Sequence, residues 1–246
     1  MLFIGNFSEI WLFSAVLLAA LPTATNVFVI AQQYGVWVQR ASASVLITTC
    51  LSVMTVTGLL YMIRHGKPSS TWGEEADPDP GLDAAGKAQA EAAADALMAL
   101  PEADRPTRVF SSPLRRCRET AQPYADRIGV PVEIDPAIGE IPSPKALSDE
   151  ARGPWLRNAF TQQWAEVQGD IDYDVWRKAV GAAVAAKAGA AVFSHFVAIN
   201  AAVSCTTGDD RVLSFRPDHT SITVFDATGG VLSLVERGPE AVTQVL

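Results

Sequence analysis

The spacing of hydrophobic positions changes near residue 57. Before it, residues 10–21 and 45–63 are uncharged apolar runs, and the second run has about the length of a helix that crosses a bilayer. After it, short apolar runs of strand length alternate with longer segments of helical composition. The chain is therefore predicted to have two parts: residues 1–57, a membrane-type segment with two spans, and residues 58–246, a globular domain.

The first part has almost no charge, since Glu9 and Arg40 are its charged residues. Nearly every helical face is apolar, whereas a helix in a globular core usually keeps a polar stripe. We therefore expect two transmembrane helices, the first interrupted at Pro22, and membrane association through the lipid bilayer. Arg40 favours a globular domain outside the cytoplasm, but one residue leaves the side open, and the domain is cytoplasmic if the segment does not insert.

The second part alternates between predicted strands and predicted helices. Residues 61–66 are expected to form a short strand that ends in a polar turn. Further strands are expected at residues 108–110, 190–194, 221–226 and 231–236, and helices at residues 83–100, 114–128 and 196–205. Such alternation predicts an α/β fold with a mostly parallel sheet that is covered on both faces. In open sheets of this kind, the chemistry lies at the carboxyl ends of the strands.

Basic groups stand at three of these strand ends. Arg64 and His65 follow the first strand, Arg116 lies near the start of the helix after the second, and His195 follows a third. A lone histidine at a strand end is usually a packed residue. The motifs Arg-His-Gly, Ser-Ser-Pro-Leu-x-Arg and Ser-His, each at a strand end, rarely coincide by chance, so together they indicate a site.

The motifs of the second part resemble those of the histidine phosphatase superfamily, also called phosphoglycerate-mutase-like. The resemblance covers residues 59–236 and rests on LLYMIRHG (59–66), GLDAAGKAQAEAAADAL (81–97), VFSSPLRRCRETAQPYA (109–125), GEIPSP (139–144), AVFSHFVAINAAV (191–203) and DHTSITVFD (218–226). It implies a three-layer α/β/α sandwich. It also implies an enzyme that hydrolyses a phosphomonoester through a phosphohistidine.

The resemblance assigns a role to each matching residue. His65 falls on the nucleophile, Arg64 and Arg116 on the phosphate-binding arginines, and His195 on the second active-site histidine, which also contacts the phosphate. Glu140 falls on the acidic proton donor. Departures from the family pattern are Thr71 for an asparagine, Phe196 for a glycine and Asn200 for an arginine, and these bear on substrate fit.

This chemistry sets requirements on protonation. Arginine suits a phosphate dianion because its planar fork donates paired hydrogen bonds and stays protonated, and the helix that begins near Pro113 can add its positive end. His65 must be unprotonated at the attacking nitrogen, with its other N–H held by an acceptor such as a backbone carbonyl, and nearby arginines favour this state. Glu140 must hold a proton, so its pKa must be raised, and His195 can act as a cation. No metal or organic cofactor is required.

Other residues have plainer interpretations. Arg115 and Arg118 are expected on a solvated helix face, Cys117 inside a packed helix, and His219 on a loop before a strand rather than in the site. Three tryptophans either line a substrate cap or pack in the core: Trp155, Trp164 and Trp176.

The first part resembles the carboxy-terminal end of the auxin efflux carrier family of membrane transporters, on the segments LPTATNVFVIAQQYG (21–35) and ASASVLITTCLSVMTVTGLL (41–60). Only the last two spans of a carrier are covered, and two spans cannot complete a substrate cavity, so we expect an anchor or a remnant rather than a transporter. Residues 58–63 are claimed by both parts, because they end the second span and begin the first strand. If the enzyme folds, the span must stop near residue 57.

Composition narrows the function classes. The net charge of −8 argues against a nucleic-acid partner, and three scattered cysteines and three histidines match no zinc or multi-histidine metal site. The prediction is a phosphatase acting on a small phosphorylated metabolite or a phosphorylated protein side chain, tethered to a membrane or fused to a remnant. The alternatives are a phosphoglycerate-mutase-type enzyme and a non-enzymatic membrane protein. Substrate specificity is expected to lie in the irregular segment 145–171, so the sequence does not predict the substrate. It does not predict the oligomeric state either.

Overall fold

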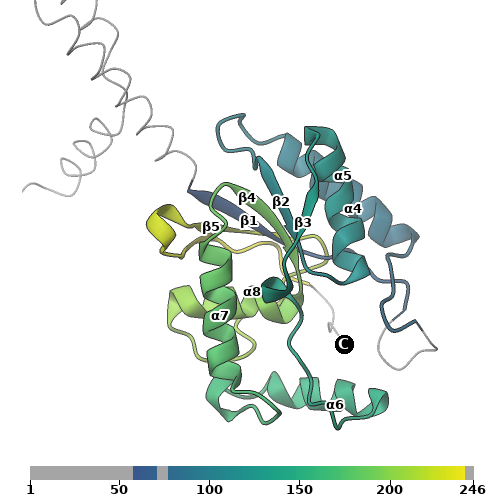
Figure 1. Ribbon diagram of the computed structural model, residues 1–246, viewed down its shortest axis with the longest axis vertical. Coiled ribbons are helices and arrows are strands. Elements are labelled where there is room, and N and C mark those ends of the chain that lie inside the picture. The colour runs from purple at the N-terminus through teal and green to yellow at the C-terminus, as the bar shows by residue number, and fades with distance from the viewer. Residues whose placement is uncertain (1–57, 71–76, 242–246) are drawn as a thin grey trace, which may run out of the picture. The chain divides into compact units, whose positions relative to one another are not determined.

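The computed structural model describes residues 58–70 and 77–241 (Figure 1). Its strands are β1 (Leu59–Arg64), β2 (Arg108–Ser111), β3 (Val132–Ile134), β4 (Ala190–Ser194), β5 (Ile222–Asp226) and β6 (Ser233–Glu236). Its α-helices are α4 (Ala84–Met98), α5 (Arg115–Ile128), α6 (Asp149–Ala159), α7 (Tyr173–Ala185) and α8 (Phe196–Thr207), and three short 3₁₀ helices are η1 (Pro136–Ile138), η2 (Trp164–Glu166) and η3 (Thr228–Gly230).

One sheet of six strands, in the order β3-β2-β4-β1-β5-β6, forms the centre of this part of the chain. β1 pairs parallel with β4, and β4, β2 and β3 continue in parallel. β5 pairs antiparallel with β1 and with the edge strand β6. The predicted α/β fold with a mostly parallel sheet is confirmed, and the antiparallel pairs are confined to one side of the sheet.

Alternate residues of β1 point to opposite faces of the sheet, as the period of a strand requires. Leu60 and Met62 belong to an apolar core that also contains residues of α7 and α8. Tyr61 and Ile63 belong to a second core with residues of α4 and α5. Figure 1 shows these two helix pairs on opposite sides of the sheet, so helices cover both of its faces.

The residues claimed by both parts of the chain form a sheet strand. Leu60, Met62 and Ile63 are fully buried between β4 and β5. The carbonyl of Gly58 accepts a hydrogen bond from the amide of Ala227 at 2.8 Å, so the sheet contacts begin at the first described residue. The predicted first strand is therefore present, as the enzyme interpretation requires.

The two predicted membrane spans, with Glu9, Pro22 and Arg40, lie outside the described residues. Among residues 58–70 and 77–241, no helix is both long enough and apolar enough to cross a bilayer. The division of the chain at residue 57 remains a prediction.

Three elements were not predicted from the sequence: β3, α6 and α7. β3 has three residues, mostly exposed, so it lacks an apolar signal. α6 contains Pro154, which is unfavourable within a helix. α7 begins at a capping residue, Asp172, whose carboxylate accepts from the amides of Asp174 and Val175. Local composition underestimated each of these elements.

The tryptophans of this region pack in the core. Trp164 is 1% exposed, and Trp155 and Trp176 pack against the same apolar cluster. The rings of Trp164 and Trp176 lie 5.9 Å apart. Of the two interpretations left open by the sequence, the structure supports core packing.

Candidate active site

The register of two parallel strands brings two histidines together. Arg64, the last residue of β1, is paired with Ser194, the last residue of β4. His65 and His195 therefore leave the sheet side by side, and their ring centroids lie 5.3 Å apart. Both rings are buried, and the amide of His65 donates to the carbonyl of Ser194 at 3.0 Å.

Arg116, in the first turn of α5, connects the two imidazoles. Its Nε lies 3.3 Å from Nε2 of His65, and its terminal nitrogen lies 3.3 Å from Nδ1 of His195. The side chain is buried. It lies next to the end of β4 because α5 follows β2, which pairs directly with β4. The structure thus places one guanidinium against both histidines.

His65 is held in one tautomer by the backbone. Its Nδ1 lies 2.8 Å from the carbonyl oxygen of Gly66, which can only accept, so Nδ1 carries the proton and Nε2 presents its lone pair. Burial first, then His195, Arg116 and Arg64, lower the pKa of His65 well below its usual range. The predicted neutral state follows, but its main cause is burial rather than the arginines.

His195 is held through Ser112, the second serine of the motif before α5. Nε2 of His195 lies 2.7 Å from Oγ of Ser112, and Nδ1 faces the donor Arg116, so Nε2 carries the proton. Burial, followed by Arg116 and Arg64, lowers the pKa of His195 well below its usual range. The cationic state expected for His195 is therefore disfavoured in the protein alone, because low polarity and two guanidinium groups both oppose it.

Arg64 presents an unpaired donor. One terminal nitrogen donates to the carbonyl of Pro217 at 2.9 Å, whereas the buried Nε has no hydrogen-bond partner among the described residues. Burial lowers the pKa of Arg64 to about 10. Its guanidinium lies 5.2 Å from the ring centre of Phe196, so the residue that departs from the family pattern packs against this arginine. A buried donor without a partner is costly, and an anion would satisfy it.

Glu140 lies beside the same groups. Its Oε2 is 3.5 Å from Nδ1 of His195 and 3.9 Å from a terminal nitrogen of Arg116. Burial raises the pKa of the Glu140 carboxyl, although Arg116 opposes this shift. η1 precedes Glu140, and its last residue, Ile138, accepts from Oγ of Ser194 at 2.7 Å. The segment is thereby attached to the end of β4.

Four contacts at the site were missed from the sequence. Nδ1 of His219 lies 3.1 Å from the carbonyl oxygen of His65, so His219 does sit on a loop before a strand, but that loop reaches the site. Ser112 binds His195 as described above, and Oγ1 of Thr120 accepts from the amide of Gly66 at 3.0 Å. The available signal was spacing: Thr120 lies one helical turn after Arg116, on the same face.

Cys117 is the fourth contact, and it is also the packed helix residue that was predicted. It is fully buried, with Sγ 3.4 Å from Nε2 of His195. Burial raises the pKa of the Cys117 thiol strongly. It is therefore a neutral thiol behind the imidazole.

Arg115 and Arg118 lie on a solvated face of α5, as predicted, with about half of each side chain exposed. The predicted contribution of the helix end to the site remains a prediction. The amide of Arg115, the first residue of α5, donates to the carboxylate of Asp79 at 2.8 Å. This amide is therefore already paired within the protein.

Asn200 has a structural role. Its carbonyl oxygen accepts from the amides of Ser214 and Phe215 at 2.9 and 3.1 Å, and its amide nitrogen donates to the carbonyl of Phe196. This departure from the family pattern ties α8 to the following loop. Thr71, the remaining departure, lies outside the described residues.

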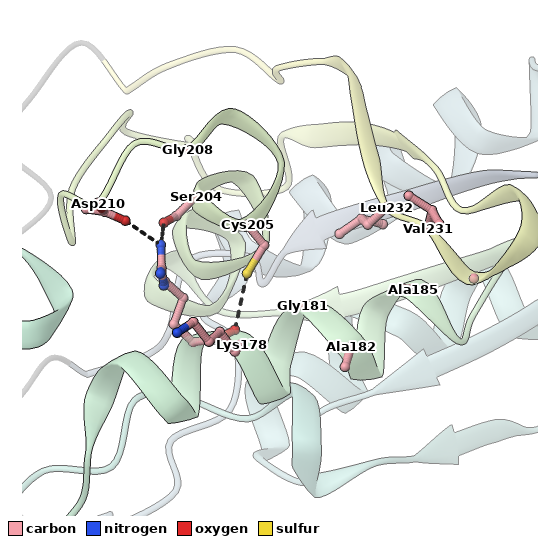
Figure 2. A pocket seen from close by; sticks show the side chains of 12 residues that line it. Lys178, Gly181, Ala182, Ala185, Ser204, Cys205, Gly208, Asp210, Val231 and Leu232 are labelled. Atoms are coloured by element: carbon pink, nitrogen blue, oxygen red, sulfur yellow. Dashed lines mark hydrogen bonds and ion pairs between the residues drawn. The ribbon is translucent and has the colours of Figure 1, made fainter.

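A separate hollow of about 450 Å³ lies between α7, α8 and the segment after η3 (Figure 2). Figure 2 shows Ser204 and Asp210 at one end and Val231 and Leu232 at the other. Arg177 lines it but is paired with Asp174, Ser204 and Asp210. The hollow contains none of the motif residues.

Within the described ranges, no group of three or more histidine, cysteine, aspartate or glutamate side chains is placed to hold a metal ion. The absence of a cofactor from the chemistry remains a prediction.

Comparisons with known proteins find two families along the chain, whose matches meet at residue 60. Residues 60–238 match the family described as the histidine phosphatase superfamily (branch 1), and residues 3–60 match the family described as membrane transport protein. A protein of Rhizobium meliloti that bears the name of a malonate transporter is 73% identical over 62 residues, which are 25% of this chain and 19% of that protein. The predicted likeness of the first part to a membrane-carrier family is confirmed.

Two proteins similar to the second part are named phosphatases. A glucosyl-3-phosphoglycerate phosphatase of Mycolicibacterium vanbaalenii is 33% identical over 125 residues, covering 47% of this chain and 54% of that protein. The chain thus spans only about half of that relative, and less of the carrier-like one. The crystal structure of a phosphoserine phosphatase from Entamoeba histolytica, in complex with 3-phosphoglyceric acid, superposes with a TM-score of 0.57 at 20% identity, covering 74% of this chain and 96% of that one; this likeness concerns the fold.

The motif residues therefore gather at the carboxyl ends of β1 and β4 and at the start of α5, and the family match over residues 60–238 includes all of them. On this evidence the chain belongs to the histidine phosphatase superfamily, branch 1.

Proposed function

We propose that residues 58–246 form a phosphatase that hydrolyses phosphomonoesters through a phosphohistidine at His65. The observation that carries this proposal is the arrangement around His65. Its Nε2 lone pair is free of a proton and faces Arg116, and the buried Nε of Arg64 has no partner among the described residues. A neutral nucleophile beside two guanidinium groups is what attack on a phosphate dianion requires.

The first half-reaction transfers the phosphoryl group to the enzyme. Nε2 of His65 forms a bond to phosphorus while the bond from phosphorus to the ester oxygen breaks. Arg64 and Arg116 stabilise the charge on the equatorial oxygens, each through charge-assisted hydrogen bonds worth about 1.5–3 kcal/mol. Glu140, whose carboxyl pKa is raised by burial, gives its proton to the leaving alkoxide.

The second half-reaction releases the phosphate. Glu140, now a carboxylate, takes a proton from water as the water oxygen attacks phosphorus, and the bond from phosphorus to Nε2 breaks. The hydrogen bond from Nδ1 of His65 to Gly66 persists through both steps and stabilises the charge that develops on the ring. His195, kept in place by its Nε2 contact with Ser112, donates to a phosphoryl oxygen from Nδ1 once the bound dianion favours the protonated imidazole.

The names of two similar proteins, a glucosyl-3-phosphoglycerate phosphatase and a phosphoserine phosphatase, support a small phosphorylated metabolite as the substrate. A phosphorylated protein side chain is the second substrate class that the sequence left open. Both carry the same phosphomonoester group, so the site chemistry applies to either.

The proposal is tested by measuring phosphate release from a panel of phosphorylated metabolites with the full chain. The wild-type protein releases phosphate, and His65→Asn lowers kcat/KM by about 10³ or more, since the nucleophile is lost. Labelled phosphate that becomes bound to the protein identifies the intermediate. Phosphohistidine is lost in acid and survives in base. Hydrolysis that persists in His65→Asn contradicts the proposal, and isomerisation of a phosphoglycerate in place of phosphate release favours a mutase.

Residues 1–57 are proposed to attach this phosphatase to a membrane, which the match to a membrane transport family supports. Fractionation of cells that express the full chain tests the attachment. Activity confined to the soluble fraction contradicts it and leaves the segment as a remnant.

A further inference from the structure

His219 is a third imidazole at the site, and the mechanism above gives it no role. Its ring centroid lies 5.8 Å from that of His65, at an interplanar angle of 51°. The side chain is half-buried, whereas His65 and His195 are buried.

The turn that carries His219 is bonded to the end of β1. The amide of Thr220 donates to the carbonyl of Arg64 at 3.1 Å, and the amide of Arg64 donates to the carbonyl of Ser221 at 3.3 Å. The guanidinium of Arg64 also donates to the carbonyl of Pro217. The position of His219 is therefore fixed relative to the residue that precedes His65.

The backbone of this turn is strained at the next residue. Thr220 has a φ of 56°, and it is the one non-glycine residue with a positive φ in the described part of the chain. A β-branched residue in this region is a conformational outlier, and such outliers persist where the surrounding contacts determine the geometry and cluster at functional sites. The strain accompanies the placement of His219 against His65.

The contact with His65 determines what His219 can bind. The carbonyl of His65 can only accept, so Nδ1 of His219 carries the ring proton and Nε2 carries a lone pair. No described residue bonds this Nε2. Burial first, and then Arg64, lowers the pKa of His219, which keeps the ring neutral and Nε2 an acceptor. The oxygens of a phosphate dianion are acceptors as well, so they do not complement it.

We infer that His219 determines substrate specificity: its Nε2 accepts a hydrogen bond from a hydroxyl or ammonium group of the substrate, close to the ester oxygen. Reacting atoms approach to about 3–3.5 Å, so a phosphoryl group at His65 places its neighbouring atoms within reach of a ring 5.8 Å away. The selected class is phosphomonoesters of polyols, hydroxy acids and amino alcohols, over those of apolar alcohols. This inference rests on the proposed function.

The test compares two substrates of equal charge and chain length with the full chain: glycerol 1-phosphate and n-propyl phosphate. The readout is the ratio of their kcat/KM values, because partial misfolding lowers both values equally and leaves the ratio unchanged. The wild-type ratio is expected to be about tenfold or more in favour of glycerol 1-phosphate, since a site that binds a hydroxyl rejects the analogue without it.

Three variants complete the test. His219→Leu lowers the ratio about fivefold to tenfold, the loss of one hydrogen bond. His219→Gln retains part of the ratio, because its amide offers both a donor to the His65 carbonyl and an acceptor. Arg216→Leu, which alters an exposed residue of the same segment, leaves the ratio at the wild-type value.

Two results overturn the inference. Either the wild-type protein shows a ratio of kcat/KM values near one, or His219→Leu shows the same ratio as the wild-type protein. If that variant loses activity on both substrates equally and inorganic phosphate inhibits it less, His219 binds the phosphate instead. A wild-type protein that hydrolyses no phosphomonoester contradicts the proposed function itself, so the two failures are distinct.

Discussion

Each histidine of the site has one ring nitrogen that is held by a neighbouring group of the protein. Gly66 fixes His65, Ser112 fixes His195, and the carbonyl of His65 fixes His219. These partner groups have little freedom to move, because two are backbone carbonyls and the third is the hydroxyl of a fully buried serine. The tautomers follow from neighbours that act in one way only, since the two carbonyls accept and Arg116 donates to Nδ1 of His195.

The proton on Glu140 leads to a prediction at the same scale. Glu140→Gln lowers kcat/KM for an alkyl phosphate by about 10²–10⁴, and lowers it much less for p-nitrophenyl phosphate, whose leaving group needs no proton. Because burial raises the pKa of Glu140, the protonated fraction falls as pH rises through that pKa. The wild-type rate on an alkyl phosphate therefore declines on that limb, and the variant lacks it.

Steady-state rates on both substrates across pH check this expectation. Glu133→Gln is the matched control, since Glu133 is an exposed residue of β3 that pairs with Arg108 of β2. Equal losses on the two substrates in Glu140→Gln would show that Glu140 does not supply the proton.

At the scale of elements, the site loop lies against the start of α4. A Cβ added to Gly86 in α4 would lie 2.1 Å from the carbonyl oxygen of Lys67, and one added to Gly66 would lie 2.7 Å from the carbonyl oxygen of Gly86. Asp83 caps α4 at the same place, by accepting from the amide of Gly86 at 2.6 Å. The helix therefore supports the loop that follows His65, and two glycines permit the approach.

Gly86→Ala is expected to destabilise the domain by about 1–3 kcal/mol, because the added methyl group overlaps backbone that cannot move freely. It also lowers activity, since the carbonyl that holds Nδ1 of His65 belongs to Gly66. Urea unfolding and phosphate release measure the two effects.

Gly153→Ala in α6 is the control for this substitution. The nearest atom to its added Cβ is 3.5 Å away, at the end of a flexible arginine, so the change is tolerated and gains up to about 1 kcal/mol of helix propensity. Similar unfolding midpoints for both variants would contradict the close packing at Gly86.

At the scale of the whole molecule, the sheet gathers buried basic groups at one edge. Arg64 and His65 come from the end of β1, His195 from the end of β4, and Arg116 from α5, and all four are at most 7% exposed. Burial disfavours the charged state of each imidazole, so the folded domain binds fewer protons at these histidines than the unfolded chain does.

This difference in proton binding predicts the pH dependence of stability. Unfolded histidines take up protons below about pH 6.5, whereas His65 and His195 in the folded domain do not until much lower pH. The free energy of unfolding therefore falls as pH drops below about 6.5, by about 1 kcal/mol per pH unit for each histidine. Glu140 acts in the opposite sense, because its raised pKa favours the folded state at low pH.

Denaturant unfolding of the wild type and of His65→Asn, between pH 7 and pH 5, measures the histidine contribution. The variant is expected to lose less stability over this interval, by about 1 kcal/mol per pH unit. Parallel curves for the two proteins would show that His65 is not kept neutral by the fold.

The sequence by itself determined the elements with strong local signals and the residues of the motifs. The uninterrupted apolar run of β4 and the alanine-rich α4 were predicted within a few residues of their observed bounds. The motif residues Arg64, His65 and His195 were identified because they lie at the ends of such strands. Burial periodicity and strand ends are properties of neighbouring residues, so the sequence carries them.

Tertiary structure alone decided which distant side chains meet. His219 reaches His65 across 154 residues, and Asn200, inside a motif, turns away to bind Ser214 and Phe215. Strand order set the position of His219, because β5, whose preceding turn carries it, pairs with β1 rather than with a strand nearer in sequence. The tautomers and the main cause of each pKa shift depend on the same contacts and on burial. No local sequence pattern encodes these contacts, since they join residues of different strands, helices and loops at the carboxyl ends of β1 and β4.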